Sequence, residues 1–397
     1  MNSTVEQLIR QYTEHEKNGG KAWNTLFQNI TINNNKQVKA KKLTFKIAYS
    51  IENVEKNRYR DISPYDQNRI TLGSEENYIN ASPVPVEETG QKYILCQGPL
   101  DETCSDFWQM IWENNVQTIV MLNRLIERGQ LKCSPYYPNS MVKDKITFAS
   151  PVLGPFKIDC ESMDEQEDYT IRNLIVSQEG QTEVKKVVHL QYTEWPDFGV
   201  PRTPSDFLHF LEKYWEIHGM DNTNTPSVVH CSAGVGRSGT FVLVDTVIRM
   251  AKRGMKVDIE KLICRLREKR MGLIQTPQQL RFSWYSIVAY FESQYGASSS
   301  LNLNNTEDME IKGIVDRKRE SVDDDMRKDM DEGEGEGNET LAKRRQLIAL
   351  MVARSRAAEA SISSSSISIS TVLPSSSMAI TSIGVVVIAG ILYYYTR

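Results

Sequence analysis

A cysteine and an arginine six residues further on, Cys231 and Arg237, carry the side chains that phosphate chemistry needs. A thiolate is a strong nucleophile, and a guanidinium group can hold two phosphate oxygens at once. Three glycines, Gly234, Gly236 and Gly239, lie between them or just after them. Glycine permits turns that bulkier residues avoid and lets backbone N–H groups approach a bound anion. We therefore expect a phosphate-binding loop with Cys231 as its nucleophile.

The spacing does not by itself identify such a loop, because Cys264 and Arg270 share it. That second pair encloses no glycine and has charges at a helical period, so we expect it on a helix surface. Around Cys231, the run 227–230 predicts a buried strand and the run 240–248 a buried helix. A helix N-terminus after a strand stabilises both an anion and a thiolate. A nucleotide-binding loop, the alternative, would end in Gly-Lys-Ser or Gly-Lys-Thr and would not begin with cysteine.

The composition narrows the class of protein. The formal net charge of −4 gives no general basic field, so we expect no nucleic-acid partner. Six cysteines are scattered without a regular spacing, which favours free thiols in a reducing compartment. The first residues lack the basic and apolar regions of a secretory leader, so we expect the bulk of the chain to lie in the cytosol.

The chain divides into three regions by composition. Residues 1–296 mix apolar strands, helical periods and turns, as expected for one folded domain. Residues 297–377, first acidic and then basic and serine-rich, predict a disordered linker that is either a spacer or a partner-binding segment. Within it, 341–360 fits a basic amphipathic helix as well as a linker. The uncharged stretch 378–395 predicts a C-terminal transmembrane anchor, the alternative being a buried core helix.

Five further segments join the loop in an order that resembles the tyrosine-specific, non-receptor protein-tyrosine phosphatases. They are KNRYRD (56–61), NYINA (77–81), QGPL (97–100), WPDFGVP (195–201) and QTPQQ (275–279). The resemblance implies a single α/β phosphatase domain with a twisted mixed sheet flanked by helices. The C-terminal stretch makes the tail-anchored 1B and T-cell subtype the most similar. No cofactor and no metal are expected.

The resemblance also implies catalytic roles. Cys231 attacks phosphorus and forms a phosphocysteine, while Arg237 holds the phosphate. Asp197, on a mobile loop, acts as general acid and then as general base, although its local sequence also fits a turn aspartate. Gln275 positions the hydrolytic water, and Ser238 hydrogen-bonds the sulfur. The loop residues implied to bind substrate are Ser232, Ala233, Gly234, Val235 and Gly236, with Ala233 in apolar contact with the substrate ring.

Further residues are implied to shape the pocket. Tyr59 sets its depth, so that phosphotyrosine reaches the nucleophile and phosphoserine does not. Glu127 orients the loop arginine, unless it is a solvated surface charge, and His230 supports the loop. The other substrate-binding residues are Asp61, Ile62, Lys132, Phe198 and Gln279. One departure is Thr31, which stands where the subtype has an arginine that helps a second aryl-phosphate site together with Arg267, Gly272 and Gln279.

These features lead to a functional hypothesis with alternatives. We expect a phosphatase for phosphotyrosine proteins such as signalling kinases or receptors, inactivated reversibly when peroxide oxidises Cys231. The alternatives are a catalytically inactive phosphotyrosine-binding module and a phosphoinositide or dual-specificity phosphatase. The anchor would hold the domain on the cytosolic face of the endoplasmic reticulum membrane, the mitochondrial outer membrane being the alternative.

Overall fold

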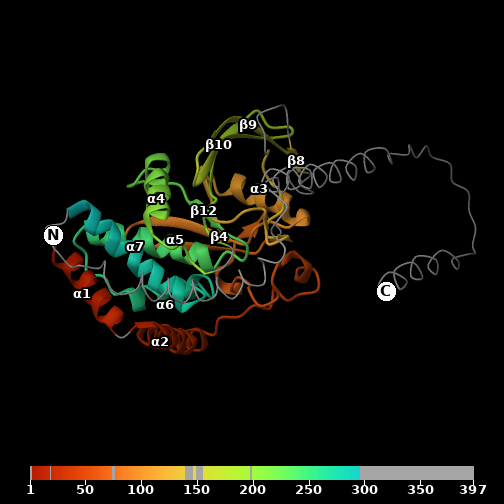
Figure 1. The fold of residues 1–397 in the computed structure, drawn as a ribbon. Helices are drawn as coiled ribbons and strands as arrows, with labels where there is room; N and C mark the ends of the chain where they lie inside the picture. Colours follow the sequence, from red (N-terminus) through yellow and green to blue (C-terminus); the bar gives the residue numbers. More distant parts are fainter. Residues whose placement is uncertain are drawn as a thin grey trace, which may run out of the picture. The chain divides into compact units, whose positions relative to one another are not determined.

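A mixed eight-stranded sheet forms the centre of the computed structural model (Figure 1), in the order β3-β4-β12-β5-β11-β10-β9-β8. The structure describes residues 2–17, 19–73, 77–138, 146–148, 155–196 and 199–295. The strands of the sheet are β3 (Ala81–Val86), β4 (Gln91–Cys96), β5 (Thr118–Met121), β8 (Ile146–Phe148), β9 (Phe156–Glu165), β10 (Tyr169–Gln178), β11 (Val184–Tyr192) and β12 (Ser227–His230). The prediction of one α/β domain with a mixed sheet is confirmed.

Two short antiparallel pairs lie outside this sheet. They are β1 (Thr71–Leu72) with β2 (Asn77–Tyr78), and β6 (Ile126–Glu127) with β7 (Gln130–Leu131). The second pair matters for function because it carries Glu127. Its two-residue turn consists of Arg128 and Gly129, whose φ angles of 51° and 71° are those of a tight hairpin turn.

The strand β12 lies at the middle of the sheet and leads to the cysteine loop. It pairs in parallel with β4 on one side and β5 on the other, and all four of its residues are buried. Strands buried on both faces read as continuous apolar runs, which explains why the strand at 227–230 was predictable. Because parallel strands end at the same edge of a sheet, the segments after β4, β5 and β12 converge there.

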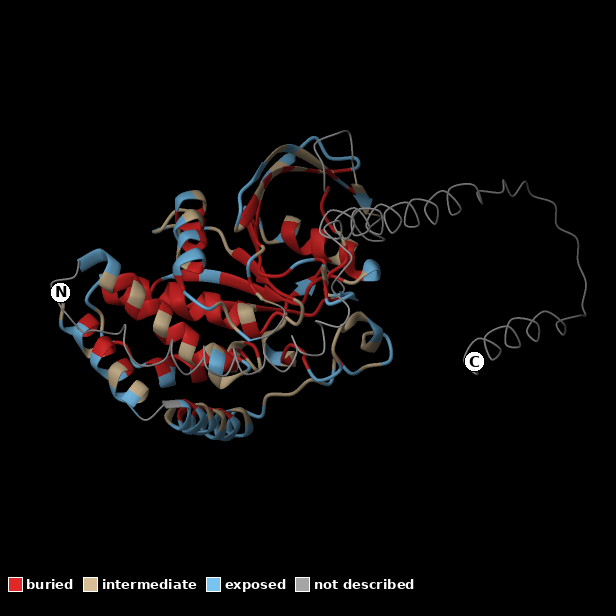
Figure 2. Ribbon diagram, in the orientation of Figure 1, coloured by how far each residue is buried: buried red, intermediate tan, exposed pale blue. Residues whose placement is uncertain are grey.

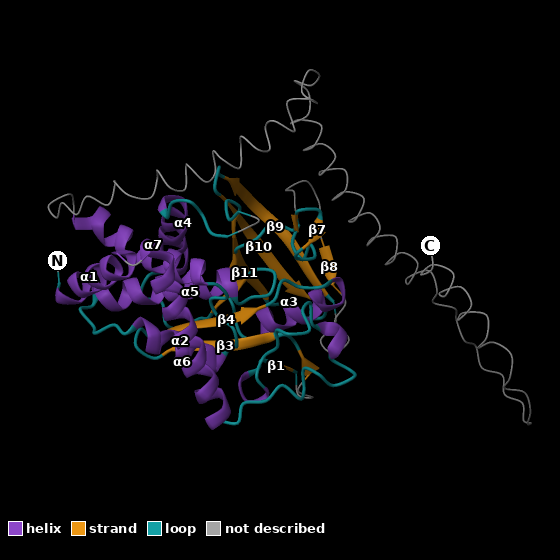
Figure 3. Cartoon of the chain, turned by 60° about the horizontal axis from the view of Figure 1, so that its bottom comes forward, coloured by secondary structure: helices purple, strands orange, loops and turns teal. Residues whose placement is uncertain are grey.

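Helices cover both faces of the sheet (Figures 1 and 3). One core lies between the sheet and α1, α2, α4, α5, α6 and α7, and a second core lies between the sheet and α3. The helices are α1 (Ser3–Lys17), α2 (Gly19–Ala40), α3 (Cys104–Glu113), α4 (Ser205–His218), α5 (Gly236–Lys252), α6 (Ile259–Lys269) and α7 (Pro277–Tyr295). All residues of α5 except Arg237 and Lys252 are buried (Figure 2), so the buried helix predicted at 240–248 is confirmed.

No helix in the described part of the chain has both the length and the hydropathy that crossing a bilayer requires. The predicted linker, 297–377, and the predicted anchor, 378–395, lie outside the described residues. All of the described residues therefore belong to the predicted folded domain, 1–296, which carries the cysteine loop.

Candidate active site

The loop that follows β12 places Cys231 at a strand-to-helix turn. Cys231 comes directly after the strand, is 5% exposed, and is followed by α5, which begins at Gly236. Val235 precedes the helix and makes no side-chain capping bond. The first backbone N–H groups of α5 are therefore available to donate hydrogen bonds to another acceptor, such as a bound anion.

Position 234 needs glycine for two reasons: its backbone conformation disfavours other residues, and the loop leaves no room there for a side chain. Its φ is +70°, and a Cβ atom there would lie 1.8 Å from the carbonyl oxygen of Cys96 at the end of β4. Gly98 is less confined, since its Cβ would lie 2.9 Å from the carbonyl oxygen of Cys231. The loop and the QGPL segment thus touch backbone to backbone, which explains the glycine at each of these two positions.

Four consecutive carbonyl groups of the loop are bound from outside the loop. Their donors are the backbone of the QGPL segment, the side chain of Arg270 and the backbone before α7. The pairs are Gly98 N to Ser232 O (2.9 Å), Arg270 Nη2 to Ala233 O (3.1 Å), Arg270 Nε to Gly234 O (2.9 Å) and Ile274 N to Val235 O (3.0 Å). Because C=O and N–H point in opposite directions across a trans peptide, the N–H groups face inward. Inward N–H groups form an anion-binding nest.

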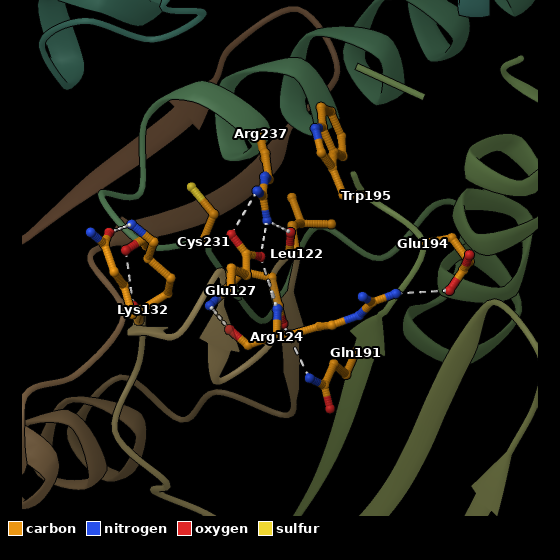
Figure 4. A network of polar contacts seen from close by, with 12 residues as sticks. Leu122, Arg124, Glu127, Lys132, Gln191, Glu194, Trp195, Cys231 and Arg237 are labelled. Carbon is orange, nitrogen blue, oxygen red and sulfur yellow. Dashed lines mark hydrogen bonds and ion pairs between the residues drawn. The ribbon is translucent and has the colours of Figure 1, made fainter. Parts of the chain in front are cut away.

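Arg237 is held in place by Glu127 (Figure 4). Its Nη1 donates to Oε1 at 2.5 Å and its Nη2 to Oε2 at 2.9 Å, and Nη1 also donates to the carbonyl oxygen of Leu122 at 3.1 Å. Glu127 is 6% exposed, so the alternative of a solvated surface charge is wrong. A guanidinium has five N–H donors, and these bonds leave Nε–H and one Nη2–H without a described partner. Those two lie on one edge, as bidentate binding of phosphate requires.

Sequence reasoning placed the second Cys-x5-Arg pair wrongly. Cys264 and Arg270 are 4% and 0% exposed, whereas we expected a helix surface. Cys264 lies on the face of α6 that packs against α2, and its thiol contacts the carbonyl oxygen of Ile30. Arg270 follows the end of α6 and turns beneath the loop, where it also binds Asn80 Oδ1 at 2.9 Å. Its role was not predictable, because helical periodicity says nothing about a side chain just beyond the helix.

The predicted pocket wall is joined to the loop by hydrogen bonds. Tyr59 Oη lies 2.8 Å from Ser232 Oγ, which in turn donates to the carbonyl oxygen of Lys132 at 2.9 Å. The Lys132 ammonium donates to Gln130 Oε1 at 2.8 Å. Arg58 anchors the same segment to the QGPL backbone. Tyr59 is thereby fixed beside the nucleophile loop.

Two amide side chains lie against the N-terminus of α5. A Cβ atom on Gly236 would lie 2.8 Å from Gln275 Oε1 and 2.9 Å from Gln279 Nε2. Gln279 also holds the backbone N–H of Gln275 through its Oε1 at 2.8 Å. Ser238 is fully buried, and its hydroxyl has no hydrogen-bond partner among the described residues. Gln275, Gln279 and Ser238 thus lie together at the N-terminus of α5, and their roles in the second step stay predictions.

The predicted general acid, Asp197, and its neighbour Phe198 lie outside the described residues. The residues on either side are described, and Trp195 Nε1 donates to the carbonyl oxygen of Gly199 at 3.2 Å. The Arg237 guanidinium carbon is 5.8 Å from the centroid of the Trp195 ring. Trp195, two residues before Asp197, therefore lies beside Arg237.

Asp61 and Ile62, two further residues predicted to bind substrate, differ in exposure. Asp61 is exposed, whereas Ile62 is buried and faces the side of Gly272, whose Cβ would lie 3.9 Å from Ile62 Cδ1. Burial raises the pKa of two neighbouring thiols: that of Cys96 rises to about 12, and that of Cys133 is also raised. Those two thiols stay protonated at neutral pH.

The structure also shows what surrounds Thr31. Its hydroxyl accepts a hydrogen bond from Arg267 Nη1 at 3.2 Å and donates to the carbonyl oxygen of Phe27 at 2.9 Å. Arg267 is 4% exposed, and it also donates to the carbonyl oxygens of Leu273 and Ile274, each at 2.8 Å. Internal partners therefore hold three of the five N–H donors of the guanidinium that would serve a second phosphate site.

The fold and the loop define a protein with a cysteine in an anion-binding nest between a central strand and a buried helix. The family model described as protein-tyrosine phosphatase matches residues 53–289. The chain belongs to the protein-tyrosine phosphatase family.

Similar curated proteins are tyrosine-protein phosphatases of the non-receptor kind. The type 2 protein of Rattus norvegicus is 44% identical over 247 residues, covering 61% of this chain and 58% of the relative. The type 61F protein of Drosophila melanogaster is 37% identical over 274 residues, covering 68% of this chain and 50% of the relative. The matched region thus spans about half to three fifths of the length of these relatives.

Proposed function

We propose that the chain is a protein-tyrosine phosphatase that hydrolyses phosphotyrosine in proteins through a phosphocysteine intermediate. The observation that carries the proposal is the pairing of Arg237 with Glu127 end-on, which leaves one edge of the guanidinium for phosphate next to Cys231. The inward N–H groups of the loop add donors for the three phosphate oxygens. Electrostatic stabilisation of this kind is the main task of an enzyme that transfers a phosphoryl group.

The reaction has two steps. In the first, the S–P bond to Cys231 forms as the P–O bond to the tyrosyl oxygen breaks, and Asp197 gives its proton to that oxygen. In the second, water attacks phosphorus, Asp197 takes the proton of the water, and the S–P bond breaks to release phosphate. Gln275 holds the water, and the hydroxyl of Ser238, which has no hydrogen-bond partner among the described residues, donates to the leaving sulfur. Both side chains lie beside the N-terminus of α5.

The substrates of this reaction are singly phosphorylated tyrosine segments of proteins such as signalling kinases or receptors. Tyr59, fixed by Ser232, gives the pocket a depth that suits a phosphorylated phenol better than phosphoserine. The internal engagement of Arg267 weakens the case for a second aryl-phosphate site. Among the subtypes of the family, the tail-anchored 1B and T-cell kind remains the assignment that the C-terminal sequence favours.

Two variants test the mechanism against its alternatives. Cys231→Ser abolishes hydrolysis of a phosphotyrosine peptide but keeps peptide binding, and Asp197→Ala retains bound substrate because the leaving group is no longer protonated. Full hydrolysis by purified Cys231→Ser protein would falsify the mechanism. An inactive parent that binds phosphotyrosine would instead indicate a binding module. Faster hydrolysis of phosphoserine or phosphoinositide than of phosphotyrosine would indicate a different class of phosphatase.

A membrane anchor at 378–395 is a separate part of the proposal and rests on its uncharged sequence, about as long as a short bilayer span. We propose that it holds the catalytic domain on the cytosolic face of the endoplasmic reticulum, the mitochondrial outer membrane being the alternative. The full chain should then stay with membranes in alkaline carbonate, while a chain that stops at residue 296 is released and active. Release of the full chain by carbonate would contradict insertion.

A further inference from the structure

A buried chain of polar contacts runs from the nucleophile loop into the sheet. His230 Nδ1 lies 3.2 Å from the carbonyl oxygen of Cys231, and His230 Nε2 lies 2.6 Å from Tyr136 Oη. The same hydroxyl lies 2.8 Å from His189 Nε2, and His189 Nδ1 lies 3.5 Å from Arg172 Nη1. Four side chains of this path are at most 3% exposed: His230, Tyr136, His189 and Arg172.

Which atom of each side chain has the hydrogen is determined by the hydrogen bond to the preceding side chain in the series, starting from Arg172. Arg172 can only donate, so its contact with His189 Nδ1, at 3.5 Å, is a hydrogen bond only in the tautomer of neutral His189 that has its hydrogen on Nε2. The inference takes this tautomer. Tyr136 then accepts from His189, and its own single hydrogen goes to His230 Nε2. The sulfur of Met121, 4.0 Å from the same hydroxyl, is a much weaker acceptor. The hydrogen of His230 is left on Nδ1, facing a carbonyl oxygen that can only accept.

We infer that Arg172 and His189 are positioning residues of the phosphatase reaction, which fix the tautomer of His230 so that its Nδ1–H supports the Cys231 backbone. The inference rests on the proposed function, because the supported residue is the proposed nucleophile. Every donor in the chain points toward Cys231, so the positive ends of the bond dipoles face the nucleophile loop. With the reverse order of protons, a nitrogen lone pair would face the Cys231 carbonyl oxygen and repel it.

The charge and burial of these groups agree with this order. Both histidines are neutral at pH 7, since burial lowers the pKa of His230 to about 4, while burial and the Arg172 charge lower that of His189 well below its usual value. The described hydrogen-bonding contacts of Arg172, to His189 and to Gln191 Oε1 at 3.1 Å, are neutral. Its guanidinium also stacks 4.5 Å from the ring centroid of Tyr137. A buried cation without a described anionic contact polarises the neighbouring bonds strongly.

Four variants separate this positioning role from ordinary packing. Arg172→Met removes the donor, Arg172→Lys keeps a donor-only cation, and Tyr136→Phe breaks the chain at its centre. Tyr137→Phe is the matched control, because it removes an equally buried hydroxyl that binds Gln191 and lies outside the chain. Thermal unfolding of each variant reports whether it folds.

The first readout is the ¹⁵N NMR spectrum of His230, which reports its tautomer without any need for turnover. The parent, Arg172→Lys and Tyr137→Phe should show the Nδ1–H form, whereas Arg172→Met and Tyr136→Phe should show a mixture. The second readout is alkylation of Cys231 by iodoacetamide at pH 6, which should slow about tenfold in the latter two variants. Neither variant alters the other titratable or charged groups around Cys231, namely Cys96, Cys133, Arg237, Glu127 and Arg270.

Failure of the proposed function and failure of this inference would give different results. If the parent lacks phosphatase activity but the NMR and alkylation results hold, the proposed function fails and the positioning role of Arg172 and His189 stands as a property of the loop. The inference is overturned if folded Arg172→Met and Tyr136→Phe keep the Nδ1–H form and the parent alkylation rate. It is also overturned if Tyr137→Phe slows alkylation as much as Tyr136→Phe does, since burial alone would then explain the effect.

Discussion

Two segments of this chain have a cysteine six residues before an arginine, but they have different conformations and different contacts. Cys231 and Arg237 enclose a glycine-rich turn whose N–H groups face inward, and the arginine keeps one edge of its guanidinium for a ligand. Cys264 and Arg270 span the last turns of a helix and the residue after it. Arg270 donates to the loop from outside and has no exposed surface.

The comparison shows that residue spacing is a weak signal and that backbone conformation decides the chemistry. Both cysteines are almost equally buried, at 5% for Cys231 and 4% for Cys264, so exposure does not separate them. What differs is the direction of the neighbouring peptide groups. Arg270, the arginine of the second pair, supports the loop of the first pair. It binds the carbonyl groups of Ala233 and Gly234 on the outside of the loop, so that the N–H groups that follow them face inward.

The largest expected effect is a difference in thiol reactivity. At pH 7, iodoacetamide should modify Cys231 at least about a hundredfold faster than Cys264, because the nest stabilises a thiolate while burial raises the pKa of Cys264. Mass spectrometry of tryptic peptides measures both rates in one sample. Peroxide should likewise oxidise Cys231 first, with activity restored by a reducing thiol. In urea, where the nest is lost, the two rates should converge; equal rates in the native protein would contradict the prediction.

A second test concerns the glycines. Gly234→Ala puts a Cβ atom 1.8 Å from a carbonyl oxygen at a φ of +70°, and we expect it to destabilise the fold by at least about 3 kcal/mol. Gly254→Ala is the matched control, since Gly254 has a φ of +66° but open space around its Cβ, and it should cost about 1 kcal/mol. Urea unfolding of the two variants separates backbone strain from the clash. Equal losses would mean that the contact with Cys96 relaxes freely.

A third test removes the outer support of the loop. Arg270→Met leaves the carbonyl groups of Ala233 and Gly234 without their donor, and we expect kcat/KM to fall about a hundredfold through loss of aligned N–H groups. Arg270→Lys, which keeps one donor, should lose less. Arg265→Met, in the adjoining helix α6, is the control, because Arg265 pairs with Glu88 at the surface.

Affinity for vanadate, a phosphate mimic, decides how the Arg270 result is interpreted. A folded Arg270→Met protein should bind vanadate more weakly than the parent, whereas the Arg265 control should bind it equally. If Arg270→Met lowers the melting temperature but keeps both vanadate affinity and kcat/KM, Arg270 stabilises the fold without shaping the nest.

The sequence predicted those parts of the site that depend on local signals. The buried strand, the glycine turn and the helix after Cys231 are contiguous, so periodicity and residue type were sufficient. Arg270 and the path through Tyr136 and His189 were missed, because their partners lie far away in sequence; Tyr136 and His230, for example, are 94 positions apart. Single-sequence patterns carry no information about such pairs, since topology alone brings them together.

The smallest expected effect concerns Arg267, which lies between Cys264 and Arg270. Thr31→Arg replaces the hydroxyl that Arg267 binds with a second guanidinium, so the two like charges should favour a phosphate between them. We expect the ratio of kcat/KM for doubly over singly phosphorylated tyrosine peptides to rise about threefold to tenfold. Thr31→Met, which adds length without charge, should leave the ratio unchanged. If Thr31→Arg also leaves it unchanged, the bonds of Arg267 to Leu273 and Ile274, and not Thr31, keep this side of the pocket closed to a second phosphate.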